Sequence, residues 1–245
     1  MIEVLIVPGT GSPRGDAITT TFANALDQER FAPSIVTYPA TYGGIEAPYA
    51  ESRALGRAAL MRAIWRASNP VIIAGYSQGA GIAGSLAAEI GAGEHPDLEV
   101  YACALIADPL RPVGAGMPHR PPAPGYGIAG ERPIYGLPTW WAAAPGDPIT
   151  ALPAGNPLRS IADLSEWWAL GDPMAAARWG QDLVDKCKQQ TFQRWWSSSN
   201  WATWGGAMAF ARGYLWDGRH GRAYIDEGHV RDLAEIVMKE FGDAR

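Results

Sequence analysis

Residues 75–79 read Gly-Tyr-Ser-Gln-Gly, which is the G-x-S-x-G pattern of a nucleophile elbow. The apolar residues 71–74 precede this pentapeptide and the small residues 80–86 follow it, so the sequence predicts the strand, sharp turn and helix that the motif requires. Because such a turn crowds the positions two before and two after the serine, glycine is expected at both. The pattern therefore predicts an exposed, reactive hydroxyl on Ser77.

A serine hydroxyl becomes a nucleophile only when a base removes its proton, and the base, usually a histidine, is oriented by an acid. In enzymes that carry this elbow on a parallel sheet, the acid and then the histidine follow the serine along the chain. Asp147 directly follows the last predicted strand, in the turn Pro-Gly-Asp-Pro, and is the preferred acid. Asp108 ends another predicted strand in a similar way and is the competing acid.

Two of the four histidines, His220 and His229, follow Asp147. His220 lies between glycines in a predicted loop that can approach Ser77 from the edge of the sheet. His229 falls in the first turn of the last predicted helix, where the helix dipole lowers the pKa of a histidine and the ring is expected to be a surface or capping group. His220 is the preferred base, and His229 remains the alternative.

An oxyanion hole needs two donors aimed at the developing negative charge. The backbone amide of Gln78 follows the nucleophile, and the amide of Thr10 lies in the glycine-rich loop after the first predicted strand. That loop matches neither G-x-G-x-x-G nor a Walker pattern, so it does not predict a phosphate site. No pair of histidines or cysteines falls at metal-ligand spacing, and no metal or other cofactor is expected.

Apolar runs alternate with helical patterns in the first half of the chain, which predicts an α/β fold with a central parallel sheet of about five strands flanked by helices. A proline- and glycine-rich stretch over 108–138 predicts a long irregular loop. Asp226 is expected to cap the last helix. Strands are predicted at 2–8, 34–38, 71–74, 98–107 and 139–144, and helices at 17–28, 48–68, 80–90 and 227–241.

The chain changes character between the candidate acid and the candidate base. Residues 151–216 are predicted to form a helical insertion, while 1–150 and 217–245 form the catalytic core. The insertion either builds its own small core or borders the active site as a lid or platform for an acyl chain. It holds eight of the eleven tryptophans, at positions 167, 168, 179, 195, 196, 201, 204 and 216.

Composition excludes several classes of protein. The 245 residues are 18% charged with a formal net charge of −5, and no basic stripe exists to bind nucleic acid. No stretch approaches the roughly 18 apolar residues of a transmembrane helix, so no stable membrane insertion is expected. The first residues, Met-Ile-Glu-Val, read as a strand and not as a signal peptide. Cys103 and Cys187 have no disulfide-framework spacing and are expected to be free buried thiols.

Several segments together resemble a known family. The elbow 75–80, the turn 144–148, the sequence Pro-Gly-Thr-Gly at 8–11, and His220 with Tyr224 close behind are similar to cutinase-type α/β-hydrolases. Within that group the chain most closely resembles the lysin B esterases of phages that infect mycobacteria and related actinobacteria. The spacing from His220 to Tyr224 matches the family and favours His220 over His229. The resemblance also implies a structural role for Asp108.

The resemblance implies a serine esterase that hydrolyses the ester joining mycolic acids to arabinogalactan and so loosens the cell envelope of the host during phage lysis. Such a protein is made in the host cytoplasm without a signal peptide and acts at the envelope after the membrane has been permeabilised. Two alternatives remain open: a cutinase, lipase or thioesterase that acts on another acyl ester, and a non-catalytic cell-wall-binding protein on a hydrolase scaffold.

Overall fold

The computed structural model describes residues 1–42, 48–156, 158–159 and 218–242. Most of the predicted insertion at 151–216 lies outside the described residues, and so do its tryptophans and Cys187. Its helical character and its role as a lid therefore stay predictions.

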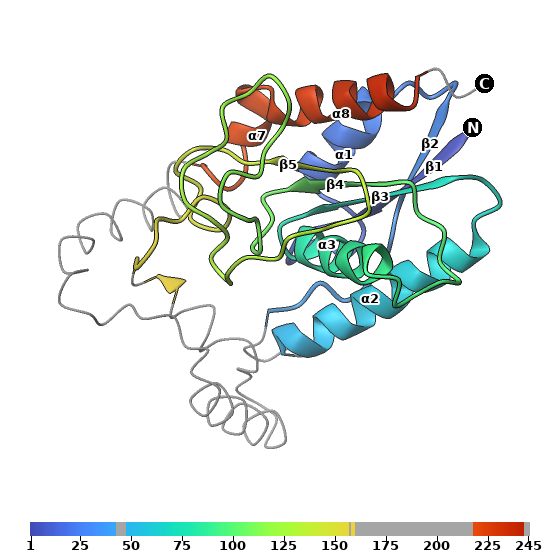
Figure 1. Cartoon of the computed structure of the whole chain (residues 1–245), viewed down its shortest axis with the longest axis horizontal. Coiled ribbons are helices and arrows are strands. Elements are labelled where there is room, and N and C mark those ends of the chain that lie inside the picture. Colours follow the sequence, from blue (N-terminus) through green and yellow to red (C-terminus); the bar gives the residue numbers. More distant parts are fainter. Residues whose placement is uncertain (43–47, 157, 160–217, 243–245) are drawn as a thin grey trace.

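Five parallel strands form one sheet in the order β2-β1-β3-β4-β5 (Figure 1). The central strands β3 and β4 are almost wholly buried, as expected of strands covered on both faces. The predicted fold class, a parallel sheet of five strands with flanking helices, is confirmed. The strands are β1 (Ile2–Val7), β2 (Phe31–Ile35), β3 (Val71–Tyr76), β4 (Ala102–Ile106) and β5 (Thr139–Ala142).

Helices cover both faces of the sheet. Figure 1 shows α1 (Ala17–Ala25) beside α8 (His229–Glu240) on one face, and α2 (Tyr49–Arg66) beside α3 (Gln78–Gly91) on the other. Successive residues of a strand point to opposite faces. Accordingly, Val4 and Ile6 of β1 belong to the core under α1 and α8, whereas Leu5 and Val7 belong to the core under α2 and α3. The short helix α7 (Ala223–Asp226) precedes α8.

Two predicted strands start at the wrong residue, and two others end elsewhere than expected: β3 at Tyr76 instead of 74 and β5 at Ala142 instead of 144. β2 was expected at 34–38, but it pairs with β1 from Phe31, opposite Ile2, to Ile35, opposite Ile6. β4 was expected at 98–107, but it begins at Ala102; Leu98 is buried in a turn before the strand. In both cases the apolar run reports burial, which extends beyond the residues that pair. The first helix also ends at Ala25 instead of 28.

The prediction that Asp226 caps the last helix is wrong. Asp226 is the final residue of α7, and Gly228 precedes α8 with a φ of 77°. That left-handed conformation interrupts the helical path between the two helices, and glycine adopts it without steric cost. α8 begins at His229 instead of 227, and His229 lies in its first turn, as predicted.

The stretch 108–138 contains no helix or strand, which confirms the predicted irregular loop. A buried arginine orders much of it: the Arg111 guanidinium donates to the carbonyl oxygens of Ala115 (2.7 Å), Ala123 (2.9 Å), Gly125 (2.7 Å) and Thr150 (2.8 Å). Carbonyl oxygens of the loop therefore accept the hydrogen bonds of this buried cation, and the guanidinium in turn fixes the loop backbone.

No helix in the described parts of the chain is long and apolar enough to cross a membrane.

Candidate active site

Ser77 stands at the junction of β3 and α3 with a strained backbone, at φ 54° and ψ −118°. The flanking glycines explain how the turn is possible. A Cβ on Gly75 would lie 2.3 Å from the Gly79 carbonyl oxygen, and a Cβ on Gly79 would lie 2.0 Å from the carbonyl oxygen of Val7. The predicted crowding of these two positions is confirmed, and the elbow requires glycine at both.

His220 reaches Ser77 from the loop before α7. Its Nε2 lies 2.8 Å from Ser77 Oγ, and its Nδ1 lies 3.1 Å from both carboxylate oxygens of Asp147. A carboxylate can only accept, so Nδ1 carries the proton and Nε2 is left to accept the serine proton. The structure thus brings together the three residues preferred from the sequence, in the arrangement in which a histidine can act as a general base.

Asp147 is completely buried in the turn that follows β5. Besides His220, it accepts hydrogen bonds from the backbone amide of Ile149 (2.9 Å) and from the hydroxyl of Tyr224 (2.5 Å). The Tyr224 hydroxyl also accepts from the amide of Ala144 (3.2 Å). These contacts fix the carboxylate that holds the imidazole.

Two tyrosines of the site were not predicted from the sequence to have a role. Tyr224 was noted only for its spacing after His220; it is fully buried, and burial together with the Asp147 carboxylate raises its pKa well above the usual value, so it stays a donor. Tyr76 precedes the serine, stacks on the His220 ring with centroids 5.4 Å apart, and donates to the His220 carbonyl oxygen. The only sequence signal for Tyr76 was its place in the elbow, directly before Ser77.

The alternative base, His229, makes no hydrogen bond to Ser77 among the described contacts. It lies between Glu227 and Arg120, with Nε2 3.3 Å from Glu227 Oε2 and Nδ1 3.3 Å from Arg120 Nη1. It is 4% exposed, so the prediction of a surface or capping group is wrong. Its pKa is lowered as predicted, but through burial and the charge of Arg120.

The alternative acid, Asp108, has a different set of partners. Its carboxylate pairs with Arg132 (2.5 Å) and accepts from the indole of Trp141 (3.0 Å) and the amide of Leu110 (3.0 Å). It is completely buried and touches no histidine in the described hydrogen bonds. Its contacts join the end of β4 to β5 and the following loop.

The two expected oxyanion donors lie on elements that are tied together. Gln78 is the first residue of α3, where a backbone amide has no acceptor within the helix. Its buried side chain donates to the Thr41 carbonyl oxygen (3.1 Å) and accepts from the Thr10 hydroxyl (3.4 Å). The Tyr38 hydroxyl lies 3.1 Å from Gln78 Oε1 and donates to the Pro8 carbonyl oxygen (2.8 Å). The loop after β1 is thereby held against the elbow.

Cys103 is buried and free, as predicted, and burial raises the pKa of its thiol. It lies in the interior of β4 and takes no part in the hydrogen-bonded group around Ser77. Among the described residues no three histidine, cysteine or acidic side chains converge as metal ligands would.

No family model matches the chain, and no curated protein sequence matches it. Its structure is similar to that of an acetyl xylan esterase (TM-score 0.49, 19% identity, covering 76% of this chain and 97% of the other). It is also similar to lysin B from Mycobacteriophage D29 (TM-score 0.45, 20% identity, 57% of this chain and 62% of the other). A cutinase-like protein from Cryptococcus sp. gives a TM-score of 0.45 at 18% identity, covering 76% of this chain and 94% of the other.

Proposed function

We propose that the chain is a serine carboxylic ester hydrolase. The observation that carries this proposal is the continuous hydrogen-bonded path from Ser77 Oγ through the His220 imidazole to the buried Asp147 carboxylate, with links of 2.8 and 3.1 Å. The strained backbone of Ser77 supports it, because such strain is maintained at functional sites.

In the proposed mechanism Ser77 Oγ attacks the ester carbonyl carbon while its proton passes to His220 Nε2. The Asp147 carboxylate stabilises the imidazolium that forms. The backbone amides of Gln78 and Thr10 stabilise the oxyanion. His220 then gives the proton to the departing alkoxide, which leaves an acyl-enzyme. Water, deprotonated by His220, hydrolyses this intermediate and restores the serine.

Within this class, we propose the ester between mycolic acids and arabinogalactan as the natural substrate. The support is the likeness of the segments around Ser77, Asp147 and His220 to the lysin B esterases. A long acyl chain also suits a protein with few charged residues, 18% of the total. Action at the envelope of the host cell, after membrane permeabilisation, belongs to the same proposal.

Replacing the serine tests the chemistry. Ser77→Ala is expected to lower kcat for p-nitrophenyl butyrate by at least about a thousandfold, because the nucleophile is lost. The circular dichroism spectrum should stay unchanged, since alanine is smaller than serine and keeps the same Cβ at this position. Hydrolysis retained by a folded Ser77→Ala protein would overturn the proposal. A fluorophosphonate probe separates an active serine from a wall-binding protein without chemistry, because an unactivated serine does not react.

The substrate needs its own assay. Purified mycolyl-arabinogalactan is incubated with the wild-type protein and with Ser77→Ala, and released mycolic acids are quantified. Release by the wild-type protein alone is expected. If short esters, triglycerides, cutin or thioesters are cleaved and mycolyl-arabinogalactan is not, the enzyme class stands and the substrate proposal fails.

A further inference from the structure

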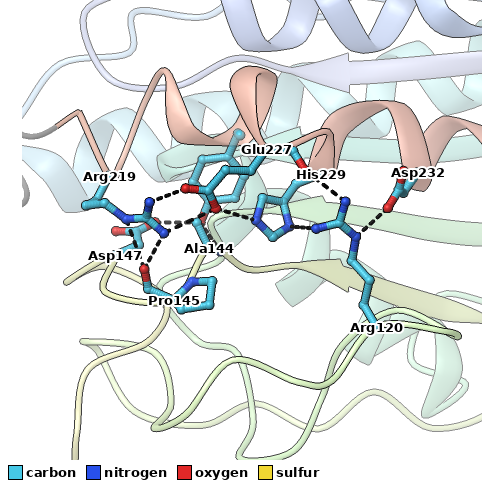
Figure 2. Close-up of polar contacts among 9 residues, drawn as sticks. Arg120, Ala144, Pro145, Asp147, Arg219, Glu227, His229 and Asp232 are labelled. Carbon is cyan, nitrogen blue, oxygen red and sulfur yellow. Dashed lines mark hydrogen bonds and ion pairs between the residues drawn. The ribbon is translucent and has the colours of Figure 1, made fainter.

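Arg219 immediately precedes His220 and joins two loops of the site. Its Nε donates to the carbonyl oxygen of Pro145 at 2.9 Å, and Nη2 donates to the same oxygen at 2.5 Å (Figure 2). Pro145 lies two residues before Asp147 in the turn after β5. A single guanidinium thus ties the residue next to the base to the turn that carries the acid.

The same guanidinium also forms a two-point contact with Glu227. Arg219 Nη1 donates to Glu227 Oε1, and Nη2 lies 3.3 Å from Glu227 Oε2. Paired contacts between arginine and carboxylate fix the direction of the side chain as well as its position. The hydrogen bond from Arg219 lowers the pKa of Glu227, against the opposing effect of burial, so the carboxylate is charged at neutral pH.

Glu227 is itself held from its far side. Arg120 Nη2 donates to the backbone carbonyl oxygen of Glu227 (2.8 Å), and Arg120 Nε pairs with Asp232 of α8 (Figure 2). His229 completes the arrangement. Arginine can only donate, so His229 Nδ1, which faces Arg120, accepts; Nε2 then carries the proton and donates to Glu227. The carboxylate that receives Arg219 is therefore anchored to the first turn of α8 and to the loop containing Arg120.

Open space borders part of this network of polar contacts. Pro145, Glu227, His229 and Arg120 line a cavity of about 180 Å³, so open space lies on one side of the network. The chain offers a useful contrast three residues later: Arg222 reaches Asp226 only at 3.9 Å, and its side chain is 88% exposed against 26% for Arg219. Arg222 therefore has an acidic partner, as Arg219 does, but it makes no close, paired contact that would hold a loop in place.

We propose that Arg219 and Glu227 are positioning residues, which hold the His220 loop against the Asp147 turn and so set the imidazole between the serine and the carboxylate. This inference rests on the proposed esterase function. Neither side chain touches Ser77 Oγ, and both act through the backbone of the loops that carry the base and the acid.

Replacement of Arg219 tests the proposal through kcat and KM measured separately. Arg219→Ala is expected to lower kcat for p-nitrophenyl butyrate about tenfold to a hundredfold, because a misplacement on the order of 1 Å has such an effect, while KM changes less than about threefold. Arg219→Lys should retain an intermediate kcat, because an ammonium cannot serve Pro145 and Glu227 in the planar, paired manner of a guanidinium. Glu227→Gln should lower kcat in the same direction. Arg222→Ala is the matched control and should keep the wild-type kcat.

Chemical rescue distinguishes positioning from general loss of structure. Millimolar guanidinium is expected to raise kcat of Arg219→Ala and to leave the wild type and Arg222→Ala unchanged, because the small cation can occupy the vacated contacts with Pro145 and Glu227. Wild-type kcat in folded Arg219→Ala would overturn the inference, as would an equal loss in Arg222→Ala. If Arg219→Ala does not fold, Arg219→Lys and Glu227→Gln decide in its place, and wild-type kcat in both would overturn the inference.

Backbone hydrogen exchange keeps the clamp separable from the esterase function. Amides of 218–228 are expected to exchange about tenfold faster in Arg219→Ala than in the wild type and in Arg222→Ala, because local opening becomes easier. Unchanged exchange would overturn the clamp even if Ser77-dependent hydrolysis is found. Faster exchange without any hydrolysis by the wild type would uphold the contact and reject the esterase function.

Discussion

The carboxylate of Asp147 has three donors: His220 Nδ1, the Ile149 amide and the Tyr224 hydroxyl. A completely buried charge is tolerated only when hydrogen bonds replace its hydration, and here each donor also fixes a direction. The Tyr224 hydroxyl has a second task, since it accepts the amide of Ala144 at the end of β5. Orientation of the imidazole therefore depends on a residue that never contacts the nucleophile.

Tyr224→Phe tests this dependence. Loss of the hydroxyl leaves the Ala144 amide without its partner and weakens the support of Asp147, so the unfolding free energy should fall by about 1–3 kcal/mol. We expect kcat to fall about tenfold, against about 10⁴-fold for Asp147→Asn, which changes the group that selects the histidine tautomer. Urea unfolding and p-nitrophenyl butyrate kinetics measure the two effects.

Tyr101→Phe is the control. Tyr101 is 42% exposed, and its hydroxyl bonds only to Glu99 in the described contacts. Both the unfolding free energy and kcat of Tyr101→Phe should therefore stay at wild-type values.

The sequence predicted which residues the structure brings together at Ser77, because each carried a local signal. The elbow has a fixed pattern, Asp147 directly follows a strand, and chain order reduced four histidines to two. The supporting contacts had no such signal. Tyr76 meets the His220 carbonyl across 144 positions of the chain, and Arg219 meets Pro145 across 74. Those contacts depend on the path of two loops, which no local pattern encodes.

At the scale of elements, the turn between β3 and α3 brings the backbones of three segments into close contact, namely β1, β3 and α3. The elbow can form only because Gly79 lets α3 begin directly against the end of β1, where the Val7 carbonyl oxygen lies. Gly81 of the same helix has a softer neighbour. A Cβ on Gly81 would meet only the Pro109 side chain, at 3.2 Å.

Gly79→Ala and Gly81→Ala form a matched pair of substitutions in one helix. Gly79→Ala is expected to lower the unfolding free energy by about 4 kcal/mol or more, because neither backbone segment can move away from a 2.0 Å contact. Gly81→Ala is expected to change it by less than about 1 kcal/mol, because the better helix propensity of alanine offsets the mild contact with Pro109. Urea denaturation of both proteins provides the comparison. Equal stability of the two variants would contradict this account of the elbow.

The long loop over 108–138 shows what a compositional pattern leaves out. Proline and glycine predicted its irregular path, but the reason for its order is the buried guanidinium of Arg111, whose pKa burial lowers. Arg159 has a similar role: it is buried, donates to backbone carbonyl oxygens and lies 3.4 Å over the ring of Tyr126. An arginine in a proline- and glycine-rich loop is ordinarily read as a surface residue, so the burial of Arg111 could not be inferred from the sequence.

At the scale of the whole molecule, alternation of apolar runs and helical patterns was enough to predict the five-stranded parallel sheet. Strand bounds were harder, since apolar residues such as Leu98 are buried outside the paired segment of β4. Ser77, Asp147 and the loop of His220 meet at one edge of the sheet because parallel strands all end there. Ser77, Asp147 and His220, which are far apart along the chain, are therefore close together in the structure.

His229, which lies near this edge, makes the stability of the folded protein depend on pH. It is buried at the start of α8, packs 5.6 Å from the Tyr224 ring, and faces the charges of Glu227 and Arg120, with Arg219 also near. Burial lowers its pKa first, the charge of Arg120 lowers it further, and Glu227 opposes them. The folded protein therefore contains a neutral histidine at a pH where the unfolded chain binds a proton.

His229→Gln tests the resulting pH dependence. A depressed folded pKa contributes stability that is present above the unfolded value, near pH 6.5, and is lost as the pH falls below it toward the folded pKa. Glutamine can donate to Glu227 and accept from Arg120 as neutral histidine does, but it takes up no proton. We therefore expect the unfolding free energy of the wild type to fall more steeply than that of His229→Gln between pH 7.5 and pH 5.5, measured by urea denaturation at several pH values. The lowered pKa of Glu227 acts in a separate window, below about pH 4.5. Parallel curves for the two proteins between pH 7.5 and pH 5.5 would show that His229 does not contribute to this pH dependence of the unfolding free energy.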